Sequence, residues 1–457
     1  MNGPQPSFHG SSAQGHVPGH YVQTARNLPE HEPLARNMTA DVCVIGAGLA
    51  GLTTALELAR KGKSVILLES ARVGFGASGR NGGFVSASFA ESIFAIEARL
   101  GLDHARALYR LSTEGVGYVR KTINDHDRNA GGDHEAIIQG HGWLKMIRHG
   151  DLASLEMRAE RLARDYGAVQ TVLSRAELGE HVSSERYHGG LLDMAPFHIH
   201  PLQYCALVAE LASRAGVRIF EHTCVRQVSM KGGIWQVQTG DHRNRKKRGS
   251  GRFIVRCSNV VVATSAYGGP VASINQSILP VSTYVVSARS ARFDEAIRFG
   301  GCLGDTRRAG DYYRLVGQGA ARRLIWGGRI TTRQSVPVDL AEKLRRDIQS
   351  VYPQLDDLEI ETAWAGLMGY AVHKMPLVGR LRDGLWMATA FGGHGLNTTA
   401  MAGLLVSSAI TSGDDRWRLF EPFGLRWGGG WAGRVATQLE YWRLQAMDRI
   451  EERRAGI

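Results

Sequence analysis

A glycine-rich turn near the N-terminus constrains the fold of this chain more than any other feature. Residues 46–51 read GAGLAG, a GxGxxG pattern, and they follow an apolar segment at 41–45. An apolar-periodic segment, 49–61, comes next, and a second apolar segment, 64–69, ends in Glu69. A strand, a tight turn, a helix and a second strand in this order predict a βαβ unit of the dinucleotide-binding type.

Each position of the motif has a predicted task. Gly46 permits the tight turn, Gly48 lets the backbone approach a pyrophosphate, and Gly51 allows the helix to pack closely on the strand. The helix N-terminus offers free N–H groups and a partial positive charge to the anion. Glu69 is placed to accept hydrogen bonds from ribose hydroxyls, which disfavours a 2′-phosphate. The alternative is a glycine-rich turn in an unrelated α/β protein, and the acidic residue at the end of the second strand argues against it.

A second glycine-rich loop, at 74–88, favours FAD over a nicotinamide dinucleotide. It contains the run SGRNGG soon after the acidic residue. Arg80 and Asn81 can serve phosphate or ring oxygens, and Gly82 with Gly83 lets the chain pass close to a flat ring. The alternative for this loop is a disordered surface segment.

Composition limits the remaining possibilities. The chain has 457 residues, 43% of them hydrophobic and 21% charged, which suits two or three packed units or one large α/β enzyme with an inserted subdomain. Its five cysteines are odd in number and widely spaced, with no CxxC, so we predict a cytoplasmic protein without a disulfide framework or a metal site. No secretory signal and no membrane span are predicted.

The net charge of +12 raises the question of an anionic partner such as nucleic acid. Residues 241–256 contain seven Lys or Arg and one Asp, so half of the excess lies in 16 residues. We interpret this run as a solvated strand–strand turn and predict no nucleic-acid partner. An RNA-associated flavoprotein is the alternative from a different functional class.

The pattern of segments predicts a discontinuous arrangement of domains. Period-two alternation over 279–330 indicates an antiparallel sheet, whereas 385–390 is a buried strand of the parallel type. The predicted parts are a mobile N-terminal arm at 1–36, a cofactor domain formed by 37–120, 190–270 and 355–413, a substrate domain formed by 121–189 and 271–354, and a helical tail at 414–457.

The stretch 41–84 resembles the D-amino-acid oxidase/glycine oxidase (DAO) superfamily of flavoproteins, and GASGRNGG is similar to the gamma-glutamylputrescine oxidase-like branch. Later segments match in order, at 259–270, 311–329, 361–366 and 391–397. The resemblance implies an α/β chain with an α+β substrate part. A Rossmann-like FAD-binding domain would carry an antiparallel-sheet substrate-binding domain of the glycine oxidase/sarcosine oxidase type.

The resemblance also implies a set of cofactor-binding residues. The loop at 392–396 is expected at the pyrimidine end of the flavin, where helix N–H groups stabilise negative charge. His394 would add a positive or donor group there, or be held by backbone hydrogen bonds; Val225 would flank the adenine or be a core valine. The full predicted set is Gly46, Gly48, Gly51, Glu69, Ser70, Arg72, Ala77, Ser78, Arg80, Asn81, Gly82, Gly83, Val225, Thr264, Gly392, Gly393, His394, Gly395 and Leu396.

Two departures from the family pattern refine the expectation. Members that bind flavin covalently use a cysteine between the WxG and the final strand, but 364–385 contains none, so we expect non-covalent FAD. Members that oxidise α-amino acids often carry an arginine just after the WxG. After Trp364 the first arginine is Arg380. This absence favours an amine whose anionic group, if any, lies far from the reacting carbon.

Aromatic and charged residues of the later segments are predicted to form the substrate pocket. Substrate binding is assigned to Phe84, Tyr284, Arg329 and Met368, and catalysis to His373, Tyr313 and Trp326. Each aromatic has the alternative of sheet core, Arg329 that of an ion pair with an acidic neighbour, and His373 that of a structural histidine.

The predicted reaction is flavin-dependent oxidation of a primary or secondary amine. Hydride passes to flavin N5, the imine hydrolyses to an aldehyde, and dioxygen is reduced to hydrogen peroxide. A gamma-glutamylputrescine-like amine is one expected substrate. An amino-acid oxidase or a dehydrogenase of the same superfamily is the alternative, and the sequence leaves the oligomeric state open.

Overall fold

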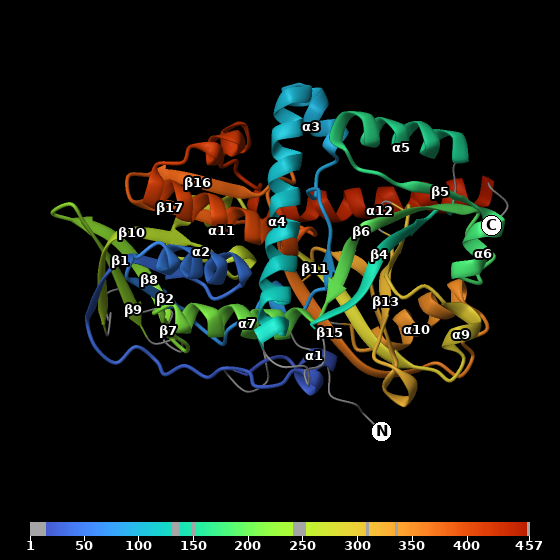
Figure 1. The fold of residues 1–457 in the computed structure, drawn as a ribbon, viewed down its shortest axis with the longest axis horizontal. Coiled ribbons are helices and arrows are strands. Elements are labelled where there is room, and N and C mark those ends of the chain that lie inside the picture. The colour runs from blue at the N-terminus through green and yellow to red at the C-terminus, as the bar shows by residue number, and fades with distance from the viewer. Residues whose placement is uncertain are drawn as a thin grey trace.

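Two β-sheets form the framework of the chain in the computed structural model, which describes residues 15–129, 137–148, 151–240, 253–307, 310–333 and 337–454. Most of the basic run at 241–256 lies outside these residues, so its predicted role as a solvated turn stays a prediction. Figure 1 shows one sheet in each half of the molecule, with a long helix between them.

The first sheet carries the βαβ unit. Its strands are β1 (Met38–Ile45), β2 (Val65–Leu68), β7 (Arg218–Phe220), β8 (Cys224–Lys231), β9 (Ile234–Gly240), β10 (Ile254–Val262), β16 (Leu377–Arg382) and β17 (Leu385–Thr389). The order is β16-β17-β10-β1-β2-β7, with β9 also paired to β10 and β8 to β9. The pairs from β17 to β7 are parallel, as the buried apolar runs predict.

The second sheet is antiparallel apart from one parallel pair, β4 with β12. Its strands are β3 (Phe84–Val85), β4 (Ile138–Met146), β5 (Thr171–Ser174), β6 (Gly189–Ile199), β11 (Leu279–Arg289), β12 (Cys302–Asp305), β13 (Tyr312–Val316), β14 (Arg323–Thr331) and β15 (Glu359–Tyr370). Both β6 and β15 lie in this sheet. The predicted domain boundaries at 190 and 355 are therefore misplaced, because a strand belongs to the sheet with which it pairs and not to its neighbours in sequence.

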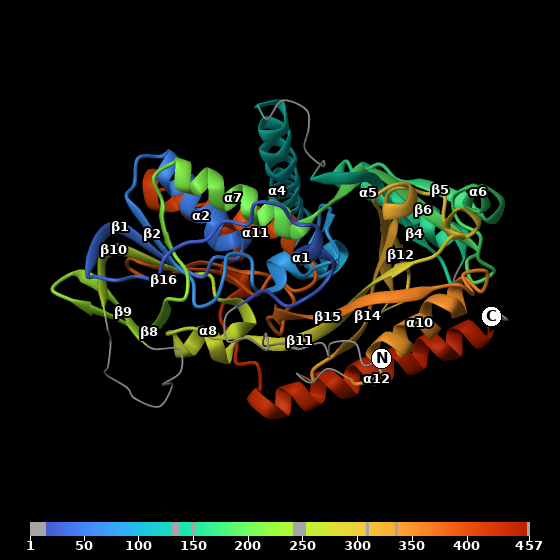
Figure 2. The ribbon, with the colours of Figure 1, turned by 90° about the horizontal axis from the view of Figure 1, so that it is seen from below.

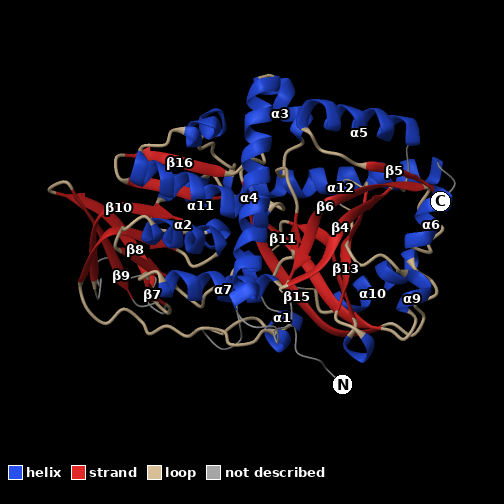
Figure 3. Cartoon of the chain, in the orientation of Figure 1, coloured by secondary structure: helices blue, strands red, loops and turns tan. Residues whose placement is uncertain are grey.

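Helices cover the first sheet and connect it to the second (Figures 1 and 3). They are α1 (His20–Thr24), α2 (Leu49–Arg60), α3 (Ile93–Leu100), α4 (Leu102–Asn129), α5 (Leu152–Tyr166), α6 (Arg175–His181), α7 (Pro201–Arg214), α8 (Ala272–Gln276), α9 (Phe293–Ala296), α10 (Leu340–Val351), α11 (Gly395–Ser412) and α12 (Gly430–Arg454). Helix α2 packs between α7 and α11, and α11 also packs on α4. Within the described ranges, no helix combines the length and the apolar character needed to cross a bilayer.

The N-terminal segment packs on the body of the protein from residue 15 onward. Val17, Tyr21 and Leu34 are buried, and the Tyr21 hydroxyl donates to the carbonyl of Asn81 over 2.8 Å. The prediction of a mobile arm over 1–36 is therefore wrong for 15–36, while 1–14 lie outside the described residues. The prediction followed the polar composition, but a few apolar anchors are enough to fix an extended segment.

His200 makes this segment sensitive to acid. Its Nδ1 accepts a hydrogen bond from the N–H of Gln203 over 3.1 Å and so caps α7 in the neutral form. Burial, followed by the charge of Arg314, lowers the pKa of His200 to about 3. Nearby, burial and Arg314 lower the pKa of His20 to about 4.

We expect the free energy of unfolding to fall as the pH drops from about 6.5 to about 4. In that window the unfolded chain binds protons at both histidines and the folded chain does not, so acid favours unfolding by on the order of 3 kcal/mol for His200. Thermal unfolding across this pH range measures the slope. His200→Asn keeps an N-cap acceptor without titrating, and it should flatten the slope. An unchanged slope would contradict the assignment.

Two glycines of α4 provide a matched test of its packing on α11. A Cβ on Gly115 would lie 2.2 Å from the carbonyl oxygen of Asn397, whereas a Cβ on Gly117 would meet nothing within 4 Å. We expect Gly115→Ala to lower the free energy of unfolding by about 1–3 kcal/mol. Gly117→Ala should raise it by about 0.5–1 kcal/mol, because alanine restricts the unfolded chain. Melting temperatures of the two variants compare them directly, and equal values would refute the close α4–α11 contact.

Candidate active site

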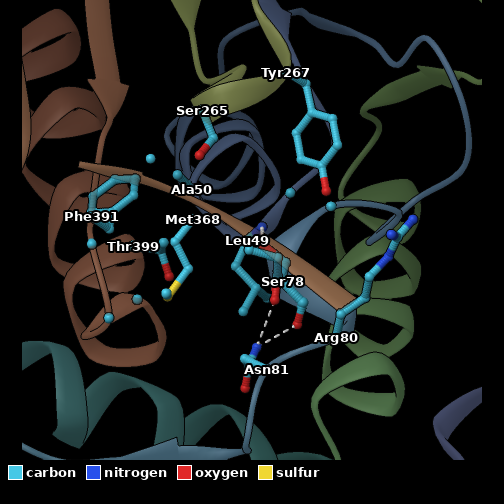
Figure 4. A pocket seen from close by; sticks show the side chains of 18 of the residues that line it. Leu49, Ala50, Ser78, Arg80, Asn81, Ser265, Tyr267, Met368, Phe391 and Thr399 are labelled. Carbon is cyan, nitrogen blue, oxygen red and sulfur yellow. Dashed lines mark hydrogen bonds between the residues drawn. The ribbon is translucent and has the colours of Figure 1, made fainter. Parts of the chain in front are cut away.

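A cavity of about 1160 Å³ extends from the βαβ turn of the first sheet to the inner face of the second. This volume exceeds that of most single small-molecule pockets, about 300–1,000 Å³, and suits a dinucleotide with a second molecule beside it. Figure 4 shows part of its wall, with Arg80 and Tyr267 on one side and Met368 and Phe391 on the other.

The turn of the GxGxxG motif has the predicted geometry. Gly46 has φ +106°, and a Cβ on it would lie 2.7 Å from the carbonyl oxygen of Ala263. A Cβ on Gly51 would lie 1.9 Å from the carbonyl oxygen of Gly46, which explains the need for glycine where the helix meets the strand. Gly48 begins α2 and lines the cavity, and a Cβ there would meet only the Ser78 side chain, at 3.1 Å. Gly46 and Gly48 thus face the cavity, and Gly51 has a packing role.

Glu69 directly follows β2 and lines the cavity. Its carboxylate accepts hydrogen bonds from the N–H groups of Ala47 and Ala71, both over 2.8 Å, and from the hydroxyl of Ser70 over 3.2 Å. Burial raises the pKa of Glu69, and these hydrogen bonds oppose the rise. Glu69 therefore shapes the turn as well as facing the ligand.

Arg72 is not part of the cavity wall. It forms ion pairs with Glu221 and Glu30, each over 3.1 Å, behind the strand. The prediction that Arg72 binds the cofactor is therefore corrected, because the buried carboxylate of Glu221 holds the Arg72 guanidinium outside the cavity wall.

The second glycine-rich loop folds around its own asparagine. Asn81 Nδ2 donates to the carbonyls of Ala77 and Ser78 over 3.0 and 2.8 Å, and its Oδ1 accepts from the N–H of Gly83 over 2.8 Å. Figure 4 shows Asn81 beside Ser78. The Ser78 hydroxyl in turn accepts from the N–H of Leu49 over 3.0 Å and so fixes the loop against the first turn of α2. Ala77, Ser78, Asn81 and Gly82 line the cavity.

Gly83 lies just outside this wall. It has φ +85°, and a Cβ on it would approach the carbonyl oxygen of Ile199 to 2.3 Å. Its glycine identity therefore serves the packing of β3 on β6, and the prediction that it contacts the cofactor is not supported. Arg80 does line the cavity, with its guanidinium 4.3 Å from the Phe75 ring.

Two buried hydroxyls indicate that the cavity is built for a polar ligand. Thr264 Oγ1 and Tyr267 OH have no hydrogen-bond partner among the described residues, and both side chains line the cavity. A buried hydroxyl without a partner is costly, so such groups point to a molecule that supplies the partner. Together with the glycine cradle and Glu69, they fit a bound dinucleotide. Val225, the predicted adenine neighbour, also lines the cavity.

The N-terminus of α11 points its free N–H groups at the far part of the cavity. The predicted flavin-binding residues Gly392, Gly393, His394, Gly395 and Leu396 all line it. The His394 side chain does not cap the helix. Burial, followed by the charge of Lys145, lowers the pKa of His394 to about 4, so the ring is neutral at pH 7. The positive field in this place therefore comes from the helix and from Lys145.

Aromatic and sulfur-containing side chains form the wall on the second sheet. Phe84 and Met368 line the cavity as predicted, together with Trp143 and Tyr312, which the sequence patterns did not single out. The Phe84 ring lies edge-on to Trp143 and Tyr312, with centroids 5.5 and 5.9 Å apart. Tyr370 and Phe391 complete this part of the wall.

The predicted catalytic aromatics lie in the core and not in the cavity. Tyr313 stacks on Trp326 with ring centroids 4.0 Å apart, and its hydroxyl shares a hydrogen bond of 2.7 Å with Tyr352. Tyr284 is buried in the same cluster. Side chains alternate between the faces of a strand, so Tyr312 faces the cavity and Tyr313 faces away. The prediction therefore chose the face of β13 that points into the core.

Two further predicted residues are also outside the cavity. Arg329 is paired with Asp347 at 2.5 Å, and its side chain is 43% exposed. His373 is buried, and its Nδ1 accepts from the N–H of Met375 over 3.1 Å. Both have the structural roles that the sequence left open as alternatives, and neither is placed for substrate binding or catalysis.

A charged cluster that the sequence did not reveal lines the second-sheet side of the cavity. Its members facing the cavity are Lys145, Asp305, Arg307 and Asp311. Arg307 pairs with Asp305 over 2.8 Å and also contacts Asp311. Behind them, the buried Arg148 pairs with Asp305 over 3.0 Å. Burial raises the pKa of Asp311 to about 6, and burial lowers the pKa of Lys145.

Comparison with known proteins agrees with this site. The family model described as FAD dependent oxidoreductase (DAO) matches residues 41–409. A probable oxidoreductase, OrdL, of Haemophilus influenzae is 32% identical over 437 residues, which cover 93% of this chain and 95% of that protein. The gamma-glutamylputrescine oxidoreductase of Escherichia coli is 31% identical over 411 residues, which cover 89% and 91%.

Solved structures show the same fold. The glycine oxidase of Geobacillus kaustophilus superposes with a TM-score of 0.67 at 20% identity and covers 85% of this chain and 99% of its own. The L-proline dehydrogenase of P. horikoshii has the same TM-score at 18% identity. These likenesses show that the fold is shared. The chain belongs to the DAO family of FAD dependent oxidoreductases.

Proposed function

We propose that this protein oxidises an amine whose far end carries a charged group, such as gamma-glutamylputrescine. The observation that carries the proposal is the group of Asp305, Arg307 and Asp311 on the second-sheet side of the cavity. An arginine beside two carboxylates suits an α-amino-acid head group, since Arg307 can bind its carboxylate and Asp311 its ammonium. The similarity to the gamma-glutamylputrescine oxidoreductase of Escherichia coli supports the same substrate class.

The aromatic wall prepares the reacting end of such a substrate. Phe84, Trp143 and Tyr312 exclude water around the amine and favour its neutral form. The N–H groups at the start of α11 and the neutral His394 stabilise negative charge that develops nearby. FAD, when bound, supplies the acceptor for the hydride removed from the carbon next to the amine nitrogen. The substrate would leave as an imine that hydrolyses to an aldehyde, with dioxygen as the final acceptor.

The test is a spectrum followed by a substrate screen. The purified protein should show flavin absorbance that is released on denaturation, as expected for non-covalent FAD. Gamma-glutamylputrescine added without air should bleach this absorbance, and under air it should release hydrogen peroxide. Putrescine, which lacks the head group, should react with a higher KM. A flavoprotein that bleaches with no amine of this series would contradict the proposal.

An α-amino acid is the second candidate substrate, because Lys145 places a cation beside His394 near the reacting end. Against it stands the absence of an arginine between Trp364 and Arg380. Glycine, D-alanine and L-proline belong in the same screen. Peroxide release from these and not from the longer amines would favour this candidate, and bleaching without peroxide would favour a dehydrogenase.

We also propose a cytoplasmic location, on the evidence of the cysteines. All five are free in the structure, and four of them are buried. Unpaired thiols suit a reducing compartment. Fractionation of the cells that produce the protein, with activity followed in each fraction, tests this proposal.

A further inference from the structure

The side of the C-terminal helix α12 that faces the protein combines polar contacts with half-buried apolar side chains such as Tyr441 and Leu444. Gln438 Oε1 accepts hydrogen bonds from the N–H of Thr332 over 2.9 Å and from the hydroxyl of Thr331 over 2.8 Å. At the other end, Glu452 pairs with Arg148 over 3.2 Å. Asp448 on the same side is only 4% exposed. Hydrogen bonds and an ion pair therefore help to attach α12 to the body, and its largest apolar side chains are left on the outer side.

The outer side of α12 is correspondingly apolar. Figure 2 shows the helix along one edge of the molecule, beneath β11 and β14. Its exposed large hydrophobic side chains run from Trp431, which is 80% exposed, to Ile450, which is 49% exposed. At 100° per residue they fall within an arc of about 100°, a continuous stripe. The stripe consists of Trp431, Val435, Leu439, Trp442, Ala446 and Ile450.

Two properties of this stripe indicate what covers it. The intervals between its members are four, four, three, four and four residues, so the pattern reads the same in both directions. A two-fold axis sets the same patch of two copies together, and with this spacing each member of the stripe meets another member when two α12 helices pair antiparallel. The sizes of the paired side chains also correspond: antiparallel pairing sets the smaller Val435 and Ala446 opposite one another, and the larger Trp431 opposite Ile450.

We propose that two copies of this chain form a dimer through antiparallel pairing of their α12 helices, with Leu439 and Trp442 at the two-fold axis. Antiparallel pairing also brings the arginines at the C-terminal end of one helix, including Arg453, to the exposed Trp427 of the other. A cation that lies over the face of an indole ring is attracted to the ring. Parallel pairing would instead set arginine against arginine.

The area available is sufficient for a stable dimer. Helix α12 has 25 residues and is about 37 Å long at 1.5 Å per residue. An exposed tryptophan offers about 150 Å² or more, and Trp427, Trp431 and Trp442 are each at least half exposed. With the aliphatic members, the stripe approaches the about 800 Å² per partner of a standard interface.

A lipid surface is the competing occupant, and the charges on the helix disfavour it. Helices that lie on anionic membranes carry basic side chains along the borders of their apolar face. On α12 the basic side chain beside the middle of the stripe, Arg443, is neutralised by Glu440 over 2.7 Å. Among the described residues of α12, Arg449, Arg453 and Arg454 form no ion pair, and they lie in the last turns of the helix, where a second copy offers indole rings.

The first experiment measures molar mass by light scattering of the full-length holoprotein during size-exclusion chromatography. The wild type should have twice the mass of one chain, and the double variant Leu439→Glu, Trp442→Glu should have half the wild-type mass. Met157→Glu on α5, at another exposed apolar position, is the matched control and should stay dimeric. Flavin absorbance and melting curves show that each variant is folded. A monomeric wild type, or a dimeric double variant, overturns the proposal.

The second experiment tests the direction of pairing. Val435→Cys and Ala446→Cys are prepared separately and treated with a short bis-maleimide, alone and mixed. Antiparallel pairing predicts crosslinked dimers in the mixture and few in either variant alone. Crosslinking of each variant with itself overturns the antiparallel arrangement. Sedimentation of a monomeric wild type with phosphatidylglycerol vesicles would assign the stripe to a membrane and overturn the dimer.

Discussion

Gly48→Val should yield a folded protein that is purified without flavin absorbance. Gly48 begins α2 at the cavity wall, where the backbone has room for the pyrophosphate because no side chain intervenes. A valine would fill this space. Losing two charge-assisted hydrogen bonds at about 1.5–3 kcal/mol each weakens cofactor binding by at least about 100-fold. Absorbance of the purified protein and titration with added FAD measure the effect.

The surroundings of Gly48 explain why the fold should survive. The nearest atom to a Cβ at this position is the Ser78 hydroxyl oxygen, 3.1 Å away, and a side chain can adjust. Gly46→Val is the contrasting variant, because its Cβ would lie 2.7 Å from a backbone carbonyl and φ is +106°. That variant should lose folded protein as well as flavin. If Gly48→Val retains full flavin content, the cradle does not hold the cofactor.

The parts of this molecule that local geometry dictates could be predicted from the sequence. At Gly46 and Gly51 of this turn the need for glycine is visible as a close approach of backbone atoms. At Gly48 it is the position on the cavity wall, where the nearest atom to a Cβ is the Ser78 hydroxyl oxygen. The acidic Glu69 follows from the same motif. The loop at 392–396 also lines the cavity as expected, because a glycine-rich segment before a buried helix leaves the helix N-terminus accessible.

Predictions that depended on which face of a strand meets the cavity were less successful. On β13 the alternation of side chains was evident, but nothing local says which face meets the cavity. The choice of Tyr313 over Tyr312 was therefore wrong by one residue, and one residue moves a side chain to the opposite face. Trp326 was misassigned for the same reason.

Long-range pairing hid the charged cluster. Lys145 lies in β4, Asp305 ends β12 and Asp311 comes just before β13. Strands β4 and β12, far apart in sequence, come together as a parallel pair. No motif links them. A buried arginine such as Arg148, 4% exposed in a chain rich in arginine, is recognised only when its carboxylate partners are placed around it. The polar contacts of α12 could not be predicted either, since Thr332, the partner of Gln438, lies about 100 residues earlier.

Arg307→Leu should raise the KM for an amine with a remote carboxylate by about 10–150-fold, which corresponds to a charge-assisted hydrogen bond of about 1.5–3 kcal/mol. The turnover number should change little, because the cluster binds the far end of the substrate and not the reacting carbon. For putrescine, which has no carboxylate, KM should stay within a few-fold of the wild-type value. Steady-state peroxide release gives KM and the turnover number for each of the two substrates.

The matched control is Arg329→Leu, which removes an arginine whose guanidinium is paired with Asp347 outside the cavity. It should leave both KM values unchanged. Removing Arg307 leaves Asp305 paired with Arg148 at 3.0 Å, so the site should stay folded, and retained flavin absorbance verifies this. An equal rise in KM for both substrates would show that Arg307 maintains the shape of the cavity and does not bind the head group. Removing Arg307 also takes a cationic neighbour away from Asp311, so the pKa of Asp311 should rise further from about 6. The acidic limb of the pH–KM profile should therefore lie at a higher pH in the Arg307→Leu variant than in the wild type.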